Sequence, residues 1–244
     1  MRLLRSYLPR NDVSYYLYNM KHVVVLTGAG MSAESGIKTF RDADGLWEGH
    51  DVMEVASPEG FKANPELVLD FYNQRRKQLL TVKPNQAHLD LAALEKEFKV
   101  SIITQNVDDL HERAGSTNVI HLHGELLKAR STGNINDVFD CKTDILLGDL
   151  CDSGHQIRPH IVWFGEDVPM IEKAMEICET ADILMIIGTS MQVYPAAGLM
   201  HYAPSGIPVY FIDPKPSVDS NKNLTVIAEN ATIGVRKVIT EFLK

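Results

Sequence analysis

Residue types that can perform chemistry gather at the points where apolar runs of the sequence end. Five such clusters follow predicted strands, at 28–32, 105–108, His123, 188–190 and 213–215. The carboxyl ends of parallel strands meet at one edge of a sheet, and ligands bind there in open α/β folds. The fold alone does not require five polar or glycine-rich strand ends. The pattern therefore predicts one extended crevice.

A glycine turn follows the first predicted strand. The run VVVL leads through Thr27 into Gly28 and Gly30, with Ala33 three residues further on. Glycine allows the backbone to come close to a ligand, and a helix starting near Ser32 would direct free N–H groups at a phosphate. The spacing also fits the Rossmann dinucleotide fingerprint. The segment therefore predicts a dinucleotide site.

The region 38–47 separates this site from that of an ordinary dehydrogenase. It is polar and rich in turn residues, whereas the dehydrogenase fingerprint expects a second strand ending in an acidic residue. We interpret it as a loop that folds over a ligand, with Phe40 and Arg41 as contact residues. A solvated surface loop is the alternative.

Two histidines compete for the role of general base. His121 and His123 are two residues apart, so a regular strand places them on the same face, and alternation does not separate them. Either ring suits a general base because its ordinary pKa is about 6.5. A structural histidine at a strand end is the alternative. Similarly, Asn106 and Asp108 fit either a polar pocket or the turn and N-cap of the next helix.

Hydrophobic periodicity predicts strands that alternate with helices. The predicted strands are 23–27, 100–104, 119–124, 161–164, 183–187, 209–212 and 224–228. The predicted helices are 64–80, 85–98, 109–115, 169–180, 195–203 and 233–243. This alternation predicts an α/β fold with a mostly parallel sheet and helices on both faces. The segment 126–156 has no clear period and predicts an excursion from the sheet.

Composition excludes several classes of protein. The 244 residues carry a net charge of −8 with no basic run, so a nucleic-acid partner is not expected. No apolar stretch approaches the roughly 20 residues that span a bilayer. Three scattered cysteines favour a reducing compartment, and we expect a cytoplasmic monomer. Residues 1–19 contain three arginines but no apolar signal segment, and we interpret them as an N-terminal extension.

Five segments of the chain together closely resemble the sirtuin family of NAD-dependent protein-lysine deacylases. They occur in order, as GAGMSAESGIKTFRDADGLW, TQNVDDLHERAG, HLHGEL, RPHIVWFGE and GTSMQVYPA. The resemblance implies NAD as cofactor and acylated lysine side chains as substrate, with the acyl group transferred to ADP-ribose and nicotinamide released. It implies a Rossmann-like core at about 20–39, 81–125 and 160–244. A small inserted domain would comprise about 40–80 and 126–159.

The resemblance also assigns roles to residues. By its position in the His-Gly motif, His123 becomes the general base that acts on the ribose hydroxyls. Expected cofactor contacts are Gly28, Ala29, Gly30, Ser32, Ala33, Phe40, Arg41, Trp47, Gln105, Asn106, Asp108, Gly188, Thr189, Ser190, Asp213 and Lys215. Asn106 and Asp108 would hold the nicotinamide carboxamide. The chain has Asp213-Pro-Lys215 where the family often carries Asn and Glu, which leaves the adenosine-ribose contact open.

A pair of residues on one predicted helix bears on the acyl group. Tyr72 and Arg75 are three residues apart and share a helical face. They resemble the Tyr-x-x-Arg signature of sirtuins that remove succinyl and malonyl groups. A guanidinium grips a carboxylate through two charge-assisted hydrogen bonds, and a phenol adds a third. Arg76 is a competing candidate about 100° round the helix. A solvated arginine beside a half-buried tyrosine is the alternative.

The segment 162–165 resembles the family segment that pairs with an extended substrate peptide. Its residues, Val162, Trp163, Phe164 and Gly165, complete the expected substrate contacts. They also fit an ordinary core strand, and both interpretations can hold together.

The chain departs from the family at the structural zinc site of many sirtuins. The first cysteine pair would fall near Ser131 and Asn134, and only Cys151 remains of the second pair. Neither Cys141 nor His155 completes a tetrahedral set. We therefore predict no structural zinc and no other metal, with a small domain held by packing.

Other functions remain open from the sequence. A plain deacetylase would share the fold, although Tyr72 and Arg75 argue against it. Transfer of ADP-ribose to protein is possible with His123 intact. A non-catalytic NAD or ADP-ribose sensor is the alternative from another class, but binding alone requires no base. A dehydrogenase is disfavoured because the chain has no second catalytic domain.

Overall fold

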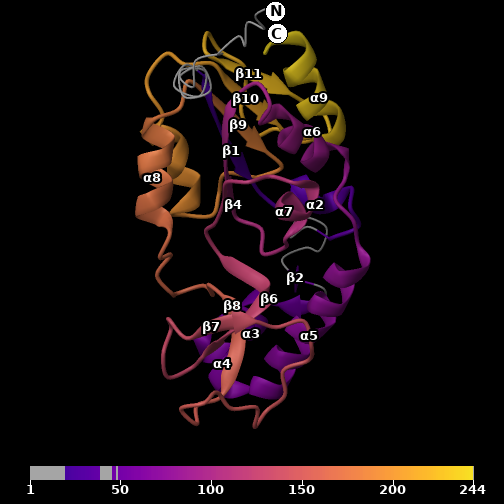
Figure 1. Ribbon diagram of the computed structural model, residues 1–244, viewed down its shortest axis with the longest axis vertical. Coiled ribbons are helices and arrows are strands. Elements are labelled where there is room, and N and C mark those ends of the chain that lie inside the picture. The colour runs from indigo at the N-terminus through magenta and orange to yellow at the C-terminus, as the bar shows by residue number, and fades with distance from the viewer. Residues whose placement is uncertain (1–19, 39–45, 48, 244) are drawn as a thin grey trace, which may run out of the picture.

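The computed structural model describes residues 20–38, 46–47 and 49–243. Figure 1 shows two lobes along the long axis of the molecule, with the large sheet in the upper lobe and a small sheet in the lower one. The lobes are joined where the strands of the large sheet end, and this junction positions the site.

The upper lobe contains a six-stranded sheet in the order β11-β10-β9-β1-β4-β5. Its strands are β1 (His22–Thr27), β4 (Lys99–Thr104), β5 (Val119–His121), β9 (Ile183–Ile187), β10 (Val209–Ile212) and β11 (Leu224–Ile227). Every neighbouring pair is parallel, which confirms the predicted fold class. The chain builds outward from β1 in one direction and later in the other. The ends of β1, β4 and β9 therefore meet at the switch point where such sheets bind ligands.

Helices cover both faces of this sheet, as predicted. On one face, α6 (Gln86–Leu94) and α9 (Ala231–Glu241) pack over alternate strand residues. On the other face, α8 (Ile171–Glu179) and the 3₁₀ helix η2 (Ala196–Tyr202) cover the remaining alternate residues. Strands buried on both faces read as continuous apolar runs, which is why their positions were predictable.

The lower lobe packs helices against a small antiparallel sheet. Its sheet has the order β7-β6-β8, with β6 (Gly124–Ser131), β7 (Val138–Asp140) and β8 (Ile157–Ile161). Its helices are α3 (Val52–Val55), α4 (Pro58–Ala63) and α5 (Pro65–Thr81), and a short hairpin joins β2 (Leu46–Trp47) to β3 (His50–Asp51). Two short helices, α2 (Gly30–Ala33) and α7 (Leu110–Ala114), follow β1 and β4 toward the junction.

Local signals fix several helix ends. The side chain of Asn64 accepts a hydrogen bond from the Leu67 N–H at the start of α5, as an N-cap residue does. Gly115 ends α7 with φ +105°, a backbone conformation that favours glycine. Among the described residues, no helix is both long and apolar enough to cross a membrane.

Four predicted elements differ from the structure. The segment 126–156 is not free of regular structure, because it contains most of β6 and all of β7. In place of the strand predicted at 161–164, the structure has β8 (Ile157–Ile161), which begins earlier, includes Pro159 and ends at Ile161. The helix predicted at 85–98 ends at Leu94. The helix predicted near Ser32 begins at Gly30 and has only one turn.

Candidate active site

One cavity of about 910 Å³ lies where the two lobes meet. It is lined by every predicted site residue that the structure describes: Gly28, Ala29, Gly30, Ser32, Ala33, Trp47, Tyr72, Arg75, Gln105, Asn106, Asp108, His123, Val162, Trp163, Phe164, Gly165, Gly188, Thr189, Ser190, Asp213 and Lys215. Phe40 and Arg41 lie outside the described residues. The volume falls within the usual range for small-molecule and cofactor sites.

Three glycines bring the ends of β1 and β9 into backbone contact. The Gly30 N–H donates to the Gly188 carbonyl at 2.8 Å. A Cβ on Gly30 would lie 2.6 Å from Gly188 Cα, and one on Gly28 would lie 2.7 Å from Thr189 Cβ. These positions therefore accept no side chain, and the two loops form a narrow backbone wall.

The expected role of the helix N-terminus needs correction. The N–H groups of Gly30, Met31 and Ser32 already donate to the carbonyls of Gly188, Gly28 and Ala29. These three groups are therefore not free for a phosphate. The physical reason is the tightness of the turn, whose local carbonyls accept from Met31 and Ser32, and its close contact with the loop after β9, whose Gly188 carbonyl accepts from Gly30.

A buried polar network closes the inner end of the cavity. The Asn106 amide donates to the Gly28 carbonyl at 3.0 Å and to Ser32 Oγ at 3.2 Å, and Ser32 donates to Asp108 Oδ2 at 2.9 Å. Burial raises the pKa of Asp108, although the hydrogen bonds from Ser32 and from the Leu110 N–H oppose this shift. The amide and the carboxyl group thus lie in fixed orientations at one end of the cavity.

His123 has the hydrogen bonding expected of a general base. Its Nδ1 lies 3.0 Å from the Gln105 carbonyl. A carbonyl only accepts hydrogen bonds, so Nδ1 carries the proton and Nε2 keeps a lone pair. Burial lowers the pKa of His123, with partial opposition from this hydrogen bond, and the ring is therefore neutral at pH 7.

The ring of His121 is held differently. Its Nδ1 lies 3.2 Å from the Asn106 carbonyl and its Nε2 lies 2.7 Å from Glu112 Oε1. Both ring nitrogens are engaged, and the ring is not among the groups that line the cavity. The structure therefore separates the two histidines that strand alternation leaves equivalent.

The outer strand ends present hydroxyl, amide and carboxylate groups. Gln105 Nε2 donates to Thr189 Oγ1 at 3.1 Å, which links the ends of β4 and β9. Asp213 is 2% exposed and accepts a hydrogen bond from the Lys215 N–H at 2.8 Å. These groups suit the hydroxyls of a sugar ligand.

Helix α5 forms the opposite wall. Tyr72 is fully buried, and its oxygen accepts a hydrogen bond from Trp163 Nε1 at 2.9 Å. Burial raises the pKa of Tyr72, against opposing effects of Trp163, Arg158 and Arg75, so the phenol keeps its proton. Arg75 is half-buried, donates to the Phe71 carbonyl at 3.2 Å and stacks on the Phe71 ring.

The neighbouring arginine points elsewhere. Arg76 is 1% exposed and donates to the Leu126 carbonyl at 3.2 Å and to Asn73 Oδ1 at 2.7 Å. It does not line the cavity. The alternative of a solvated arginine beside a half-buried tyrosine is wrong, because Tyr72 is fully buried and Arg75 is half-buried in the cavity wall.

The segment 162–165 already uses several of its own donors. The N–H groups of Val162, Trp163 and Phe164 donate to the His123 carbonyl, to Glu166 Oε2 and to the Ala56 carbonyl. A substrate strand can pair with the carbonyl groups here but not with these three donors.

The sequence and the structure were compared with known proteins. A model of the Sir2 family matches residues 28–195. The chain belongs to the Sir2 family. It is 56% identical over 226 residues to an NAD-dependent protein deacylase of Helicobacter pylori strain 26695, covering 92% of this chain and 99% of that protein. It is 55% identical over 226 residues to an NAD-dependent protein deacylase of Bacteroides thetaiotaomicron, covering 90% and 97%.

Solved structures of Sir2 proteins share the fold. A Sir2 homologue in complex with NAD has a TM-score of 0.79 and 38% identity, over 96% of this chain and 95% of that one. A Sir2 homologue mutant in complex with ADP-ribose has a TM-score of 0.79 and 37% identity, over 97% and 100%. The cavity of this Sir2 protein fits such a ligand, because it offers a glycine wall without side chains at one strand end and polar side chains that can hydrogen-bond sugar hydroxyls at the others.

Glu166 also lines the cavity of this Sir2 protein, and it was not predicted from the sequence. Glu166 accepts hydrogen bonds from Arg158 Nη1 at 2.7 Å and from Arg130 Nη2 at 3.0 Å, and it also accepts from the Trp163 N–H. The Arg158 guanidinium stacks on the Trp163 ring at 3.2 Å. The Gly-Glu ending of the RPHIVWFGE segment was the available signal, but partners 36 residues apart cannot be paired from one sequence.

The positions expected for zinc in a Sir2 protein hold a hydroxyl at Ser131, an amide at Asn134 and a thiol at Cys151. Cys151 Sγ lies 3.2 Å from Ser131 Oγ and 3.1 Å from Ser153 Oγ. These hydrogen bonds lower the pKa of the Cys151 thiol to about 7. Within the part of the chain that the structure describes, no group of three His, Cys, Asp or Glu residues is placed to hold a metal.

Proposed function

We propose that this chain removes acidic acyl groups, such as succinyl and malonyl, from lysine side chains of proteins. The broader activity follows from family membership and from the two curated relatives, and the chain is an NAD-dependent protein deacylase. The observation that carries the finer proposal is the position of Tyr72 and Arg75. Both line the cavity that contains His123, although they come from the other lobe.

The phenol of Tyr72 suits a carboxylate partner. Trp163 Nε1 can only donate, so it uses an acceptor position of the Tyr72 oxygen and leaves the O–H to donate elsewhere. The raised pKa keeps this proton on the phenol at neutral and moderately alkaline pH. A neutral donor beside a guanidinium therefore favours a carboxylate at the end of the acyl chain.

The apolar surroundings sharpen this preference. The rings of Trp47 and Phe71 form an edge-to-face pair with centroids 4.8 Å apart. The ring centroids of Tyr72 and Trp47 are 6.1 Å apart. Bringing Arg75 into an aromatic wall removes much of its hydration. A carboxylate restores charged hydrogen bonds there, whereas the methyl group of acetyl offers none.

The remaining residues act at the cofactor end. NAD, when bound, supplies the ADP-ribose that accepts the acyl group as nicotinamide leaves. Asn106 and Asp108 hold the carboxamide at the inner end, and Gln105 and Asp213 bind sugar hydroxyls. His123 Nε2 accepts a proton from a ribose hydroxyl, because its other nitrogen is fixed as a donor to the Gln105 carbonyl.

The test compares one peptide carrying succinyl-lysine or acetyl-lysine. We expect kcat/KM to favour succinyl, and Arg75→Met to lower the succinyl value about 100-fold through loss of a charge-assisted pair. Tyr72→Phe should lower it about tenfold, the loss of one hydrogen bond to a charged group. Both variants should change the acetyl value far less.

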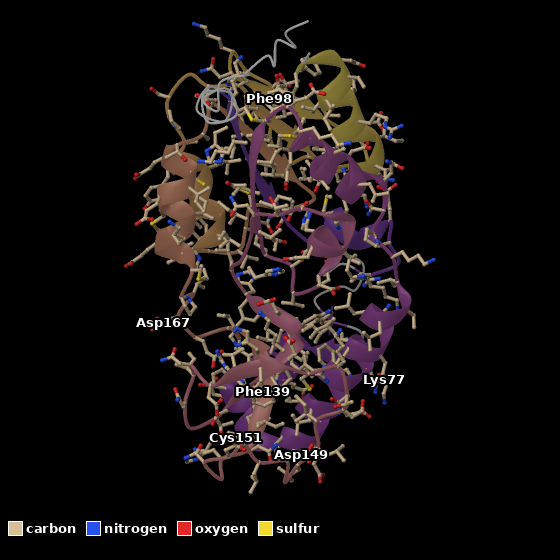
Figure 2. The ribbon with its side chains drawn as sticks, in the orientation of Figure 1. Lys77, Phe98, Phe139, Asp149, Cys151 and Asp167 are labelled. Carbon is tan, nitrogen blue, oxygen red and sulfur yellow. The ribbon has the colours of Figure 1, made fainter. Side chains whose placement is uncertain are left out.

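Lys77→Met is the matched control. Lys77 lies on the same helix, is 66% exposed and pairs with Asp144, and Figure 2 shows it pointing away from the molecule. Its acyl preference should equal that of the wild type. Equal or better turnover of the acetyl peptide by the wild type would contradict the acidic-acyl proposal and leave a plain deacetylase. Turnover of neither peptide, with NAD bound and no nicotinamide released, would indicate a sensor.

A further inference from the structure

The two histidines of the His-x-His-Gly motif hold two consecutive carbonyl groups. His123 Nδ1 contacts the Gln105 carbonyl at 3.0 Å, and His121 Nδ1 contacts the Asn106 carbonyl at 3.2 Å. The side chain of Asn106 reaches the cavity floor, where it donates to the Gly28 carbonyl and Ser32 Oγ. The backbone contact of His121 therefore fixes the residue that forms the inner end of the site.

Hydrogen-bond chemistry determines the charge of His121. The Asn106 carbonyl and the Glu112 carboxylate both accept, so each ring nitrogen must donate. A ring with two donating nitrogens is an imidazolium. We propose that His121 is a positioning residue that, in its protonated form, holds the nicotinamide end of the site by bridging the Glu112 carboxylate and the Asn106 carbonyl.

The surrounding charges agree with a cation at this position. Three carboxylates face the ring: Glu112 from α7, Glu125 from β6 and Asp108 from the loop after β4. Two basic residues also lie near these groups, and the positive charge of each is offset or absent. Lys128 of β6 is paired with Glu125 at 2.8 Å, and His111 of α7 is kept neutral because burial lowers its pKa. Burial opposes the charge, but the hydrogen bond and charge of Glu112 outweigh it and raise the pKa of His121.

Loss of the proton breaks one of the two contacts. A neutral imidazole has a single N–H, so it either faces the carbonyl with a lone pair or faces the carboxylate with one. In either case Asn106 loses a fixed anchor or Glu112 is repelled. Activity should therefore fall as the pH rises through the raised pKa of His121, while His123 stays competent because it is already neutral.

Three variants separate charge from shape. Glu112→Gln offers an amide that donates to a neutral ring, so both contacts persist at every pH above neutrality and the alkaline decline should disappear. His121→Asn keeps a donor near the position of Nδ1 without titrating. His121→Ala removes the donor and should lower kcat/KM for NAD about tenfold at pH 7, the scale of a small misplacement in an active site. His121→Asn should rescue most of that loss.

The measurement is kcat/KM for NAD between pH 6 and 10, with whichever acyl peptide is turned over faster. This choice keeps the outcome independent of the acyl-group proposal. The control is Glu97→Gln, which removes an exposed carboxylate from the segment after α6. This variant should keep the pH profile of the wild type. The NMR titration of the His121 ring provides a second measurement, with a pKa above 6.5 expected in the wild type and a lower value in Glu112→Gln.

Two results would overturn the proposal. One is an identical alkaline limb in the wild type and in Glu112→Gln. The other is a neutral His121 at pH 6.5 by NMR in the wild type. Should His121→Ala fail to fold by circular dichroism, Glu112→Gln and the NMR titration still decide.

Discussion

Glu166→Gln tests how Trp163, which lines the cavity beside Tyr72, is held in place. The carboxylate of Glu166 neutralises Arg130 and Arg158, whose side chains are only 5% and 8% exposed, and is itself 21% exposed. It also accepts the Trp163 N–H at 2.9 Å. Glutamine keeps the length and one acceptor oxygen but removes the charge. Two buried guanidinium groups then lose their shared counter-ion.

The expected cost is large for a single isosteric change. Breaking a buried ion pair from one side costs about 3–5 kcal/mol, and the partial exposure of the carboxylate favours about 3 kcal/mol. Urea unfolding should show this loss with an unchanged m-value. The KM for the acyl peptide should rise more than the KM for NAD, because Trp163 lies in the substrate wall. Glu176→Gln breaks an exposed pair with Lys173 and should cost less than about 0.5 kcal/mol.

Acid titration gives an independent check on the same reasoning. Despite burial, the hydrogen bond and charge of Arg158 lower the pKa of Glu166 below its usual 4.5. The resulting stability is present above pH 4.5 and is lost as the pH falls through the lowered pKa. Glu166→Gln should therefore lack this part of the acid transition. A loss of less than 1 kcal/mol at pH 7 would show that the two arginines find other partners and would refute the argument.

Three further predictions concern other parts of the molecule. Gly188→Ala would place a Cβ 2.4 Å from the backbone nitrogen of Met31, at a residue with φ +61°. It should weaken NAD binding, measured by calorimetry, and lower the free energy of unfolding by about 2 kcal/mol. Burial lowers the pKa of His88 to about 4. The free energy of unfolding should therefore be highest above pH 6.5 and fall by about 3 kcal/mol as the pH approaches 4. His88→Gln should flatten this pH dependence. EDTA should leave thermal unfolding and activity unchanged, because hydroxyl groups surround Cys151, and stoichiometric zinc by metal analysis would contradict this.

The upper lobe was predictable because its strands are buried on both faces. Continuous apolar runs such as 183–187 identify the strands. The polar residues that follow these runs identify the edge of the sheet where the site lies. The lower lobe gave weaker signals, because β6 mixes buried and half-buried residues without strict alternation. β8 also contains Pro159, a residue type that is uncommon within strands. The pairing of β6 with β7 and β8 depends on contacts between distant segments, which one sequence does not reveal.

The candidate site divides in the same way. Residue types at strand ends indicated which side chains gather, but the state of each group depends on partners from other elements. His121 and His123 are equivalent by strand alternation, and only the Glu112 contact distinguishes a cation from a neutral base. A carboxylate on a neighbouring helix thus changes the chemistry of a residue without touching the cavity.

Acyl preference has a similar dependence on distant partners. The direction of the Tyr72 O–H follows from the Trp163 N–H that occupies its oxygen, and Trp163 is held by the stacked Arg158 and by Glu166. Glu166→Gln should therefore reduce the preference for succinyl over acetyl, because it loosens the Trp163 contact that orients the Tyr72 O–H. An equal drop in kcat/KM for both peptides in Glu166→Gln would instead place its effect on general peptide binding or on the amount of folded enzyme. The ratio of the two kcat/KM values separates these outcomes, because a loss of folded enzyme lowers both values equally.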